Sequence, residues 1–394
     1  MSQHFLQWLE LVVRWVHLIA GISWIGTSFY FNWLNHSFRD PVKPKVGVGG
    51  ELWSVHGGGF YRVERFVVAP DELPEVLHWF KWEAYLTWLS GASLLVLVYY
   101  MGAELYLVDP AVADISTFAA IAVGVSALVL AWFMYDGLCR SPLAKFKPVL
   151  VIGLLSLLAA SAYVLGEVLG ARAAYIHVGS MLGTIMTANV LWVIIPSQQR
   201  LVAAIKRGGE PDVAEGRHAA MRSLHNNYMT LPVLFLMISI HYPVTYGHEY
   251  NWVILILLSL IGIGTRHFFN LRNAGKKAPW IAPSIIAGLV GLAVLTIPRK
   301  AGIDSGQQAS FSDIIAIVNQ RCLSCHSLTP TNDAFAAPPA GIDFDTVDRI
   351  RDFAGRIRAV AVDTETMPPG NITGITLEER RLIGDWVNRG SPID

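Results

Sequence analysis

The stretch Arg321-Cys322-Leu323-Ser324-Cys325-His326 decides the fold of the C-terminal part of this 394-residue chain. Two cysteines three positions apart with a histidine directly after them are typical of covalent attachment of a c-type haem. We expect Cys322 and Cys325 to form the thioethers and His326 to be an axial ligand of the iron. Met367, in the proline-rich run Met367-Pro368-Pro369, is the second expected axial ligand, because His/Met pairing is common in cytochromes c. The motif therefore predicts a small class I cytochrome c domain over residues 310–394.

Two other uses of these cysteines are a disulfide and half of a zinc site. The chain has 3 cysteines, and the third, Cys139, lies in a different region. Neither alternative has the partners it needs. The tail also has the expected helices: apolar residues recur at helical spacing over 311–321 and 376–389. Thr376 and Glu379 have the spacing of a capping box.

The composition upstream of the tail indicates a membrane protein. Hydrophobic residues are 53% of the chain and charged residues 15%, and the net charge of +0 gives no basis for binding nucleic acid. Apolar runs of roughly 20 residues, about one bilayer crossing, continue to Pro298. We expect an all-α fold, a polytopic eight-helix transmembrane bundle followed by the cytochrome c domain. The expected spans are 8–34, 79–101, 115–136, 147–169, 173–195, 229–246, 252–268 and 280–298.

The basic residues in the loops predict the orientation of the bundle. Loops 35–78, 137–148 and 196–228 and the region after the seventh span carry lysine and arginine, whereas loops 102–114 and 243–251 carry none. The positive-inside rule then places both termini outside the cytoplasm. This agrees with the haem motif, since such haem is attached on the exported side of a bacterial membrane. The first apolar segment is too long for a cleavable signal peptide. The prediction is a multi-pass protein of the bacterial inner membrane with periplasmic termini.

The spans contain weak signs of an internal repeat of four helices. Trp82-Glu83-Ala84-Tyr85-Leu86-Thr87 opens the second span, and His225-Asn226-Asn227-Tyr228-Met229-Thr230 opens the sixth with the same Tyr-x-Thr. The first span of each half carries a histidine, His17 or His177. Each match alone has chance as its alternative explanation. Together they support a 4+4 duplication, in which sites tend to form between the halves.

Polar residues at membrane depth are costly, so each is a candidate functional residue. Near the predicted cytoplasmic ends, the expected catalytic residues are Glu83, Lys81, Thr87 and His225. The expected substrate-binding residues are Asn226, Asn227, Tyr228, Thr230, Arg266 and Tyr85. For Lys81 and Arg266 the alternative is an ordinary positive-inside anchor, and for Tyr85 and Tyr228 an ordinary interface aromatic.

His17 and His177 form a second candidate site in the outer half of the bundle. Histidines that face inward from separate helices can ligate a b-type haem without any sequence motif. The alternative is a hydrogen bond to a neighbouring helix, which is the commoner fate of a buried histidine. His241 belongs to the same outer group.

The chain resembles the bacterial membrane-bound urate oxidases. The resemblance rests on segment 17–26 (HLIAGISWIG), segment 81–85 (KWEAY), segment 227–232 (NYMTLP) and the terminal Cys-x-x-Cys-His motif, and it covers essentially the whole chain. It implies an oxidoreductase that converts urate to 5-hydroxyisourate. It also implies that electrons pass to the fused cytochrome c domain and the respiratory chain, without hydrogen peroxide. The first span is also similar to haem-binding proteins of the protoporphyrinogen oxidase type, which favours His17 as a haem ligand.

The domain organisation expected from these observations is a urate oxidase domain over 1–298, a linker over 299–309 and a periplasmic cytochrome c domain over 310–394. The expected cofactors are covalent haem c and a candidate haem b. The expected partners are urate or a similar planar purine, a downstream cytochrome c or terminal oxidase, and the lipid bilayer. Two other functions fit the same features: a membrane protein that oxidises quinol or another substrate with a cytochrome c electron exit, and a transporter with an appended haem sensor.

Overall fold

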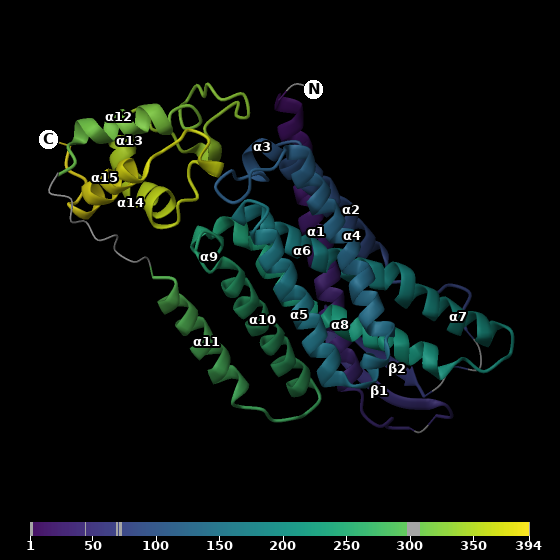
Figure 1. The fold of residues 1–394 in the computed structure, drawn as a ribbon. Helices are drawn as coiled ribbons and strands as arrows, with labels where there is room; N and C mark the ends of the chain where they lie inside the picture. Colours follow the sequence, from purple (N-terminus) through teal and green to yellow (C-terminus); the bar gives the residue numbers. More distant parts are fainter. Residues whose placement is uncertain (1–2, 44, 68–69, 71–72, 298–307, 394) are drawn as a thin grey trace.

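The computed structural model describes residues 3–43, 45–67, 70, 73–297 and 308–393 (Figure 1). Most of the described chain is helical. The expected linker over 299–309 lies mainly outside the described residues, because 298–307 are not among them. The helices fall into a long bundle up to residue 297 and a small tail domain from residue 308, each with its own apolar core.

A helix lies in each of the eight expected segments. The bundle contains α1 (Gln3–Ser37), α2 (Trp82–Leu94), α4 (Thr117–Arg140), α5 (Lys147–Gly166), α6 (Ala171–Ala188), α7 (Ile195–Lys206), α8 (Val213–Ile238), α10 (Asn251–Asn273) and α11 (Ile281–Leu295). The π-helical turn η1 (Leu95–Tyr100) extends α2, and η3 (Asn189–Ile194) joins α6 to α7. The short helices α3 (Ala103–Tyr106) and α9 (Pro243–Tyr246) lie in the connections.

Five helices in the described part of the chain are long and apolar enough to cross a membrane. They are His4–Ser37, Thr117–Arg140, Lys147–Gly166, Ala171–Lys206 and Asn251–Asn273. α2 with its π-helical extension and α8 are not in this group, and the first half of α8 carries charged residues. Eight crossings therefore remain a prediction. The apolar face of α1 is exposed, and such a face in a helix of this length is suited to lipid.

The all-α expectation is wrong in one element. β1 (Val48–His56) and β2 (Gly59–Phe66) form an antiparallel hairpin at the end of the bundle away from the tail (Figure 1). Gly57 and Gly58 both have positive φ, which suits the two-residue turn that joins twisted strands. In the sequence, the hairpin is indicated by the run Gly57-Gly58 between two segments rich in aromatic and β-branched residues.

The tail domain confirms the predicted first and last helices. α12 (Phe311–Arg321) and α15 (Leu377–Asn388) pack together, with the rings of Phe311 and Trp386 stacked at 5.9 Å, and α13 (Val347–Asp352) and α14 (Ala354–Arg358) complete the core. The capping box of Thr376 and Glu379 is formed.

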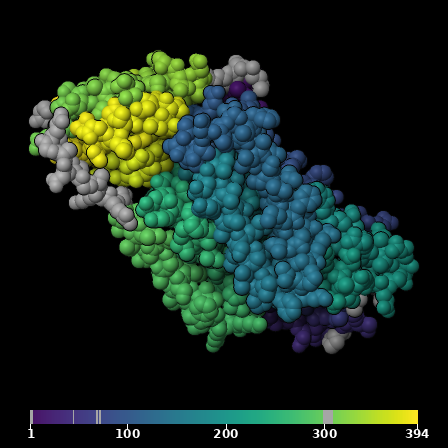
Figure 2. All heavy atoms as spheres, in the orientation of Figure 1, coloured from purple at the N-terminus to yellow at the C-terminus, as the bar shows by residue number. Residues whose placement is uncertain are grey.

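The tail lies against one end of the bundle, the end with α3 and α9 (Figures 1 and 2). A Cβ built on Gly370 would lie 3.2 Å from the carbonyl oxygen of Val108, and one on Gly247 would lie 2.7 Å from Thr366. A cleft of about 640 Å³ remains between residues 104–117 of the bundle and 370–372 of the tail. The loops on this end are those that contain no lysine or arginine.

Candidate functional site

Helix α8 carries the polar residues at the centre of the bundle. Arg222, Asn226, Asn227 and Thr230 are all buried, with Arg222 and Thr230 at 0% exposure. Because each residue of an α-helix turns the chain by about 100°, His225 and Asn227 point to opposite sides of α8. The predicted site residues on α8 are thus divided between two clusters.

The first cluster, which we call the α8–α10 cluster, consists of Asn227, Arg266 and Asn270. Arg266 Nε donates to Asn227 Oδ1 over 3.1 Å, and Asn270 Nδ2 donates to the same oxygen over 3.0 Å. The Arg266 guanidinium lies 3.9 Å from the centre of the Phe29 ring on α1, which holds the cation in place. All three polar side chains are buried.

This cluster holds buried polar atoms that have no partner. Asn227 Nδ2, Arg266 Nη2 and Asn270 Oδ1 make no hydrogen bond among the described residues. A buried donor or acceptor without a partner costs about 1–3 kcal/mol. Two free donors and one free acceptor at one place are chemically suited to a small polar ligand that carries both kinds of group.

Close packing of α8 against α10 creates the cluster. Gly262, Arg266 and Asn270 follow one another at intervals of four residues and so share a face of α10. A Cβ on Gly262 would lie 3.2 Å from both Leu231 Cβ and Pro232 Cδ. The glycine therefore allows the two helix backbones to approach one turn from Asn227.

The second cluster, which we call the α4–α8 cluster, consists of Tyr135, Asn189, Arg222, His225 and Asn226. Asn189 Nδ2 donates to Tyr135 Oη over 2.9 Å and to Asn226 Oδ1 over 2.8 Å. The Tyr135 hydroxyl, 2.9 Å from His225 Nδ1, is then free to donate its own proton to that nitrogen. Asn226 Nδ2 donates to the carbonyl oxygen of Met186. These side chains largely satisfy one another.

An ion pair connects the α4–α8 cluster to the surface. Arg222 Nη2 lies 2.6 Å from Asp136 Oδ1, and Arg140 Nε lies 2.6 Å from Asp136 Oδ2. Arg222 is fully buried while Arg140 is exposed. Arg222 also lies over the Tyr135 ring, 5.0 Å from its centre. Pairing with Asp136 is what makes a buried guanidinium tolerable here.

The predicted site residues at the start of α2 have contacts of their own, which do not involve the described residues of either cluster. Thr87 Oγ1 donates to the carbonyl oxygen of Glu83 within the helix, and the Lys81 ammonium lies 5.8 Å from the centre of the Trp82 ring. Tyr85 packs at the edge of a small cluster with Ala84. Within the described residues, no hydrogen bond or ion pair joins these side chains to α8. Their catalytic and binding roles stay predictions.

Two other predicted binding residues have local partners. Tyr228 Oη lies 2.8 Å from His267 Nδ1, and Thr230 Oγ1 donates to the carbonyl oxygen of Asn227 over 2.7 Å. Thr230 thus supports the backbone beside the α8–α10 cluster. Tyr228 also joins α8 to α10, because His267 follows Arg266 on α10.

Sequence reasoning missed several residues of these clusters: Phe29, Tyr135, Asn189 and Arg222. Asn189 carried a signal, since it is a polar residue inside an expected membrane span. Arg222 lies four residues before Asn226 and therefore shares its face of the helix.

His17 and His177 do not fit the two axial positions of one haem. His17 Nδ1 lies 3.0 Å from the carbonyl oxygen of Thr87 and 3.1 Å from Ser90 Oγ, whereas His177 Nε2 lies 3.2 Å from Tyr100 Oη. Ser90 and Tyr100 are separated by roughly 15 Å along the helix. Each histidine instead makes the hydrogen bonds to neighbouring helices that were the alternative prediction. No step is therefore assigned to a haem between them.

The residues of the Cys-x-x-Cys-His motif do fit a haem. Cys322 and Cys325 are free thiols. His326 Nδ1 donates to the carbonyl oxygen of Ile342 over 2.8 Å, which leaves Nε2 as the iron-binding nitrogen and fixes the ring as second-sphere contacts commonly do. Arg380 Nη1 donates to the carbonyl oxygen of Met367 over 2.9 Å and so holds the loop of the other expected ligand. Burial, and secondarily Cys325, raises the pKa of Cys322 to about 12.

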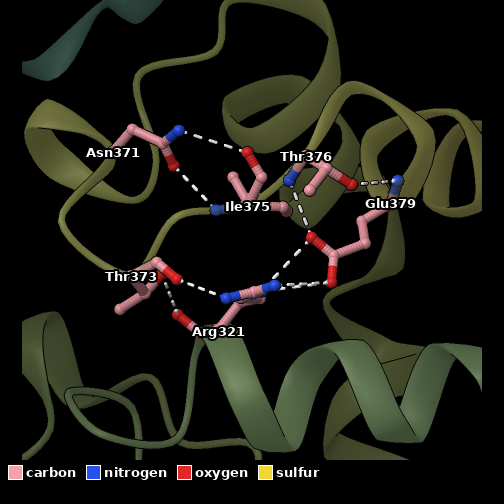
Figure 3. Close-up of polar contacts among 6 residues, drawn as sticks. All are labelled: Arg321, Asn371, Thr373, Ile375, Thr376 and Glu379. Atoms are coloured by element: carbon pink, nitrogen blue, oxygen red, sulfur yellow. Dashed lines mark hydrogen bonds and ion pairs between the residues drawn. The ribbon is translucent and has the colours of Figure 1, made fainter.

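A polar network ties the motif to the loop before α15 (Figure 3). Arg321 Nε and Nη2 donate to the Glu379 carboxylate over 3.0–3.2 Å, and Nη1 donates to the carbonyl oxygen of Thr373 over 2.6 Å. Thr373 Oγ1 returns a bond to the carbonyl oxygen of Arg321. Asn371 closes the loop by bonding the amide and carbonyl groups of Ile375.

One family comparison found a match. The sequence model described as urate oxidase N-terminal matches residues 3–297, which include both polar clusters and exclude the tail. No curated protein and no solved structure matches the chain. Because the match covers well over half of its residues, the chain belongs to the urate oxidase N-terminal family.

Proposed function

We propose that this protein is a membrane-bound urate oxidase that converts urate to 5-hydroxyisourate. The electrons pass to a haem c in its own tail and then to a downstream cytochrome c or terminal oxidase, without hydrogen peroxide. The observation that carries the proposal is the set of unpartnered polar atoms in the α8–α10 cluster, which lies inside the region matched by the urate oxidase family.

The free atoms of the cluster complement the edge of urate. Urate is a planar purine whose rim alternates carbonyl oxygens and N–H groups. Arg266 Nη2 and Asn227 Nδ2 donate to carbonyl oxygens, and Asn270 Oδ1 accepts from a ring N–H. The guanidinium adds a charge-assisted bond to an anionic substrate. Its contact with Phe29 fixes its orientation before the substrate binds.

The reaction balances with water as the source of oxygen. Urate and water give 5-hydroxyisourate, two protons and two electrons. A haem c bound at Cys322, Cys325 and His326 would accept these electrons one at a time. The chain must therefore bind urate, keep it oriented and remove protons. His225 points away from the α8–α10 cluster, so Glu83, or Lys81 with Thr87, is the proposed proton acceptor.

Anaerobic addition of urate to the purified haem-loaded protein tests this function. The expected result is reduction of haem c, followed by its absorption spectrum, with product oxygen derived from labelled water. Replacement of Cys322 and Cys325 by alanine should abolish turnover. Reduction by a quinol but not by urate would establish the rival quinol-oxidising function. Purine uptake that survives the cysteine replacements would favour the transporter, and stoichiometric peroxide would refute the proposed electron route.

A further inference from the structure

Helix α1 forms a third side of the space around the α8–α10 cluster. It packs against both α8 and α10, and the centre of its Phe29 ring lies 3.9 Å from the Arg266 guanidinium. In the proposed function this contact orients the cation and does not reach the substrate. The next inward residue of α1 is therefore a candidate for direct contact with the same ligand.

Asn32 lies one turn beyond Phe29 on α1 and points into the bundle. The Phe31 ring lies 4.8 Å from Phe80, just before α2, whereas Phe29 faces Arg266 on α10. Because each residue turns the helix by about 100°, Asn32 lies about 100° from Phe31 and about 60° from Phe29, on the side between them. Its side chain is thus directed between the start of α2 and α10.

The Asn32 side chain has a buried oxygen without a partner. Asn32 Oδ1 accepts no hydrogen bond within the part of the chain that the structure describes. His36 Nδ1, one turn further along α1, lies 2.7 Å from the backbone carbonyl oxygen of Asn32 and not from its side chain. A buried amide oxygen is costly in this condition unless a bound molecule donates to it.

Asn32 and Asn270 lie near one level on neighbouring helices. α1 and α10 both run from the tail end of the bundle toward the hairpin end (Figure 1). From the contact between Phe29 and Arg266, Asn32 lies three residues further on α1 and Asn270 four residues further on α10, or about 4.5 and 6 Å. Each offers an amide oxygen that has no partner among the described residues. The two acceptors therefore accompany the two donors of the α8–α10 cluster.

We propose that Asn32 is a substrate-contacting residue, whose Oδ1 accepts a hydrogen bond from one ring N–H of urate. The inference rests on the proposed function and specifies which purines the site takes. Acceptors on Asn32 and Asn270 and donors on Asn227 and Arg266 complement a ring edge that carries two N–H groups and two carbonyl oxygens. An alkyl or ribosyl group on the nitrogen bound by Asn32 would remove the donor and collide with the amide. The site therefore takes purine bases that are unsubstituted at this nitrogen.

Equilibrium binding of urate and of 1-, 7- and 9-methylurate to the full-length protein in lipid nanodiscs tests the inference. Asn32→Leu removes the acceptor at nearly constant volume, and Asn32→Ala also makes room for a methyl group. We expect urate binding to weaken roughly ten- to hundredfold in both variants.

The methylurates show whether the contact is direct. In the unaltered protein, the derivative methylated at the nitrogen that Asn32 binds should bind roughly tenfold or more weakly than urate. In Asn32→Ala the same derivative should bind within about twofold of urate, because the lost hydrogen bond and the collision are both absent. The other two derivatives should keep the ratio to urate that they have in the unaltered protein.

Two variants are matched controls. Asn35→Leu changes the same residue type at an exposed position of α1. Ser259→Ala removes another buried oxygen that lacks a partner in the described chain, two turns of α10 from Arg266 and beyond the close contact at Gly262. Neither should change urate affinity by more than about twofold. Thermal unfolding is the second readout: Asn32→Leu should not lower the unfolding temperature, because its oxygen makes no hydrogen bond to the described protein.

The outcomes separate this inference from the proposed function. If the unaltered protein binds and oxidises urate and Asn32→Leu binds it equally well, Asn32 does not touch the substrate and the function stands. Methylurate ratios that are the same in Asn32→Ala as in the unaltered protein would also overturn the inference, since the effect on urate would then be indirect. A clearly lower unfolding temperature in Asn32→Leu would assign Asn32 a structural role instead. Failure of the unaltered protein to bind urate would refute the function itself.

Discussion

Arg266 Nε donates to Asn227 Oδ1 over 3.1 Å across the seam between α10 and α8, while the guanidinium Nη2 and the amide Nδ2 of the same two residues have no partner among the described residues. The pair is thus held in position by one bond and offers two further donors to a ligand. A carbonyl-bearing ring that accepts both would remove their desolvation cost.

Arg266→Lys is expected to weaken urate binding roughly ten- to hundredfold, because lysine cannot bond Asn227 and a ligand with one rigid planar group. Equilibrium binding of urate to the purified protein measures the effect. Arg272→Lys, at an exposed position on the same helix, is the matched control. Unchanged affinity in Arg266→Lys would place urate elsewhere.

Glu83→Gln is expected to lower kcat by about 10²–10⁴ with little change in KM, as removal of a proton acceptor does. His225→Gln should lower kcat much less, because His225 faces away from the α8–α10 cluster. Steady-state kinetics with urate distinguish the two. The opposite ranking would assign proton removal to the α4–α8 cluster.

Gly262→Ala is expected to cost about 1–3 kcal/mol of stability and to weaken urate binding, because the new methyl group meets Leu231 and Pro232 at 3.2 Å and separates α8 from α10. Gly264→Ala is the control, since a Cβ there has no atom within 4 Å. Gly262→Ala should lower both the thermal unfolding temperature and the affinity for urate. Gly264→Ala should change neither.

Arg321→Ala is expected to destabilise the tail by about 1.5–3 kcal/mol through loss of charged hydrogen bonds. The effect should depend on pH. Burial raises the pKa of Glu379, but bonds from the Thr376 amide and Arg321 lower it by more, so the pKa lies below its usual value. A carboxyl with a depressed pKa stabilises the fold above its unfolded pKa and stops doing so as the pH falls through its folded pKa.

Denaturant unfolding of the full chain, followed by haem c absorption from neutral pH into the acid range below the ordinary glutamate pKa, measures this dependence. Glu379→Gln should flatten it and remove most of the difference caused by Arg321→Ala. A pH profile in Glu379→Gln that matches the unaltered protein would show that another group is responsible.

Haem extraction is expected to leave all haem attached to the polypeptide, because the Cys-x-x-Cys-His motif fits a haem c, whereas His17 and His177 bond to different parts of α2 and η1. Extraction in acidified acetone followed by absorption spectroscopy makes the distinction. Any stoichiometric extractable b-type haem would contradict this geometry.

Local patterns predicted much of the fold. Apolar runs marked the segments in which helices lie, and the Thr376/Glu379 spacing predicted the start of α15. The hairpin is not predicted, because its sequence lies between two expected spans and its lysine and arginine residues indicate only a basic loop. The Gly57-Gly58 turn is a local signal of a hairpin, which the overall composition of the loop does not reveal.

The candidate site was predictable only in part. Polarity at membrane depth singled out Asn227, Arg266 and His225, but the division of α8 into two faces depends on which helix packs on each side. That packing depends on Gly262 opposite Pro232, a contact between segments about thirty residues apart. Arg222 and Asn189 belong to the α4–α8 cluster through other tertiary contacts, the ion pair with Asp136 and the hydrogen bonds to Tyr135 and Asn226.

Docking of the tail through its Met367 loop uses one face of the tail and leaves another outside the contact. The face toward α3 and α9 is occupied by its own bundle, whereas α12 and α15 lie away from that contact (Figure 1). In the proposed function, an external electron acceptor would then bind on the side of α12 and α15 while the tail stays docked. Because the bundle and the tail are one chain, the transfer of electrons from urate to haem c in the proposed function has a high effective concentration and should not depend on dilution. The rate of the next transfer, from haem c to a soluble acceptor, should depend on the concentration of that acceptor.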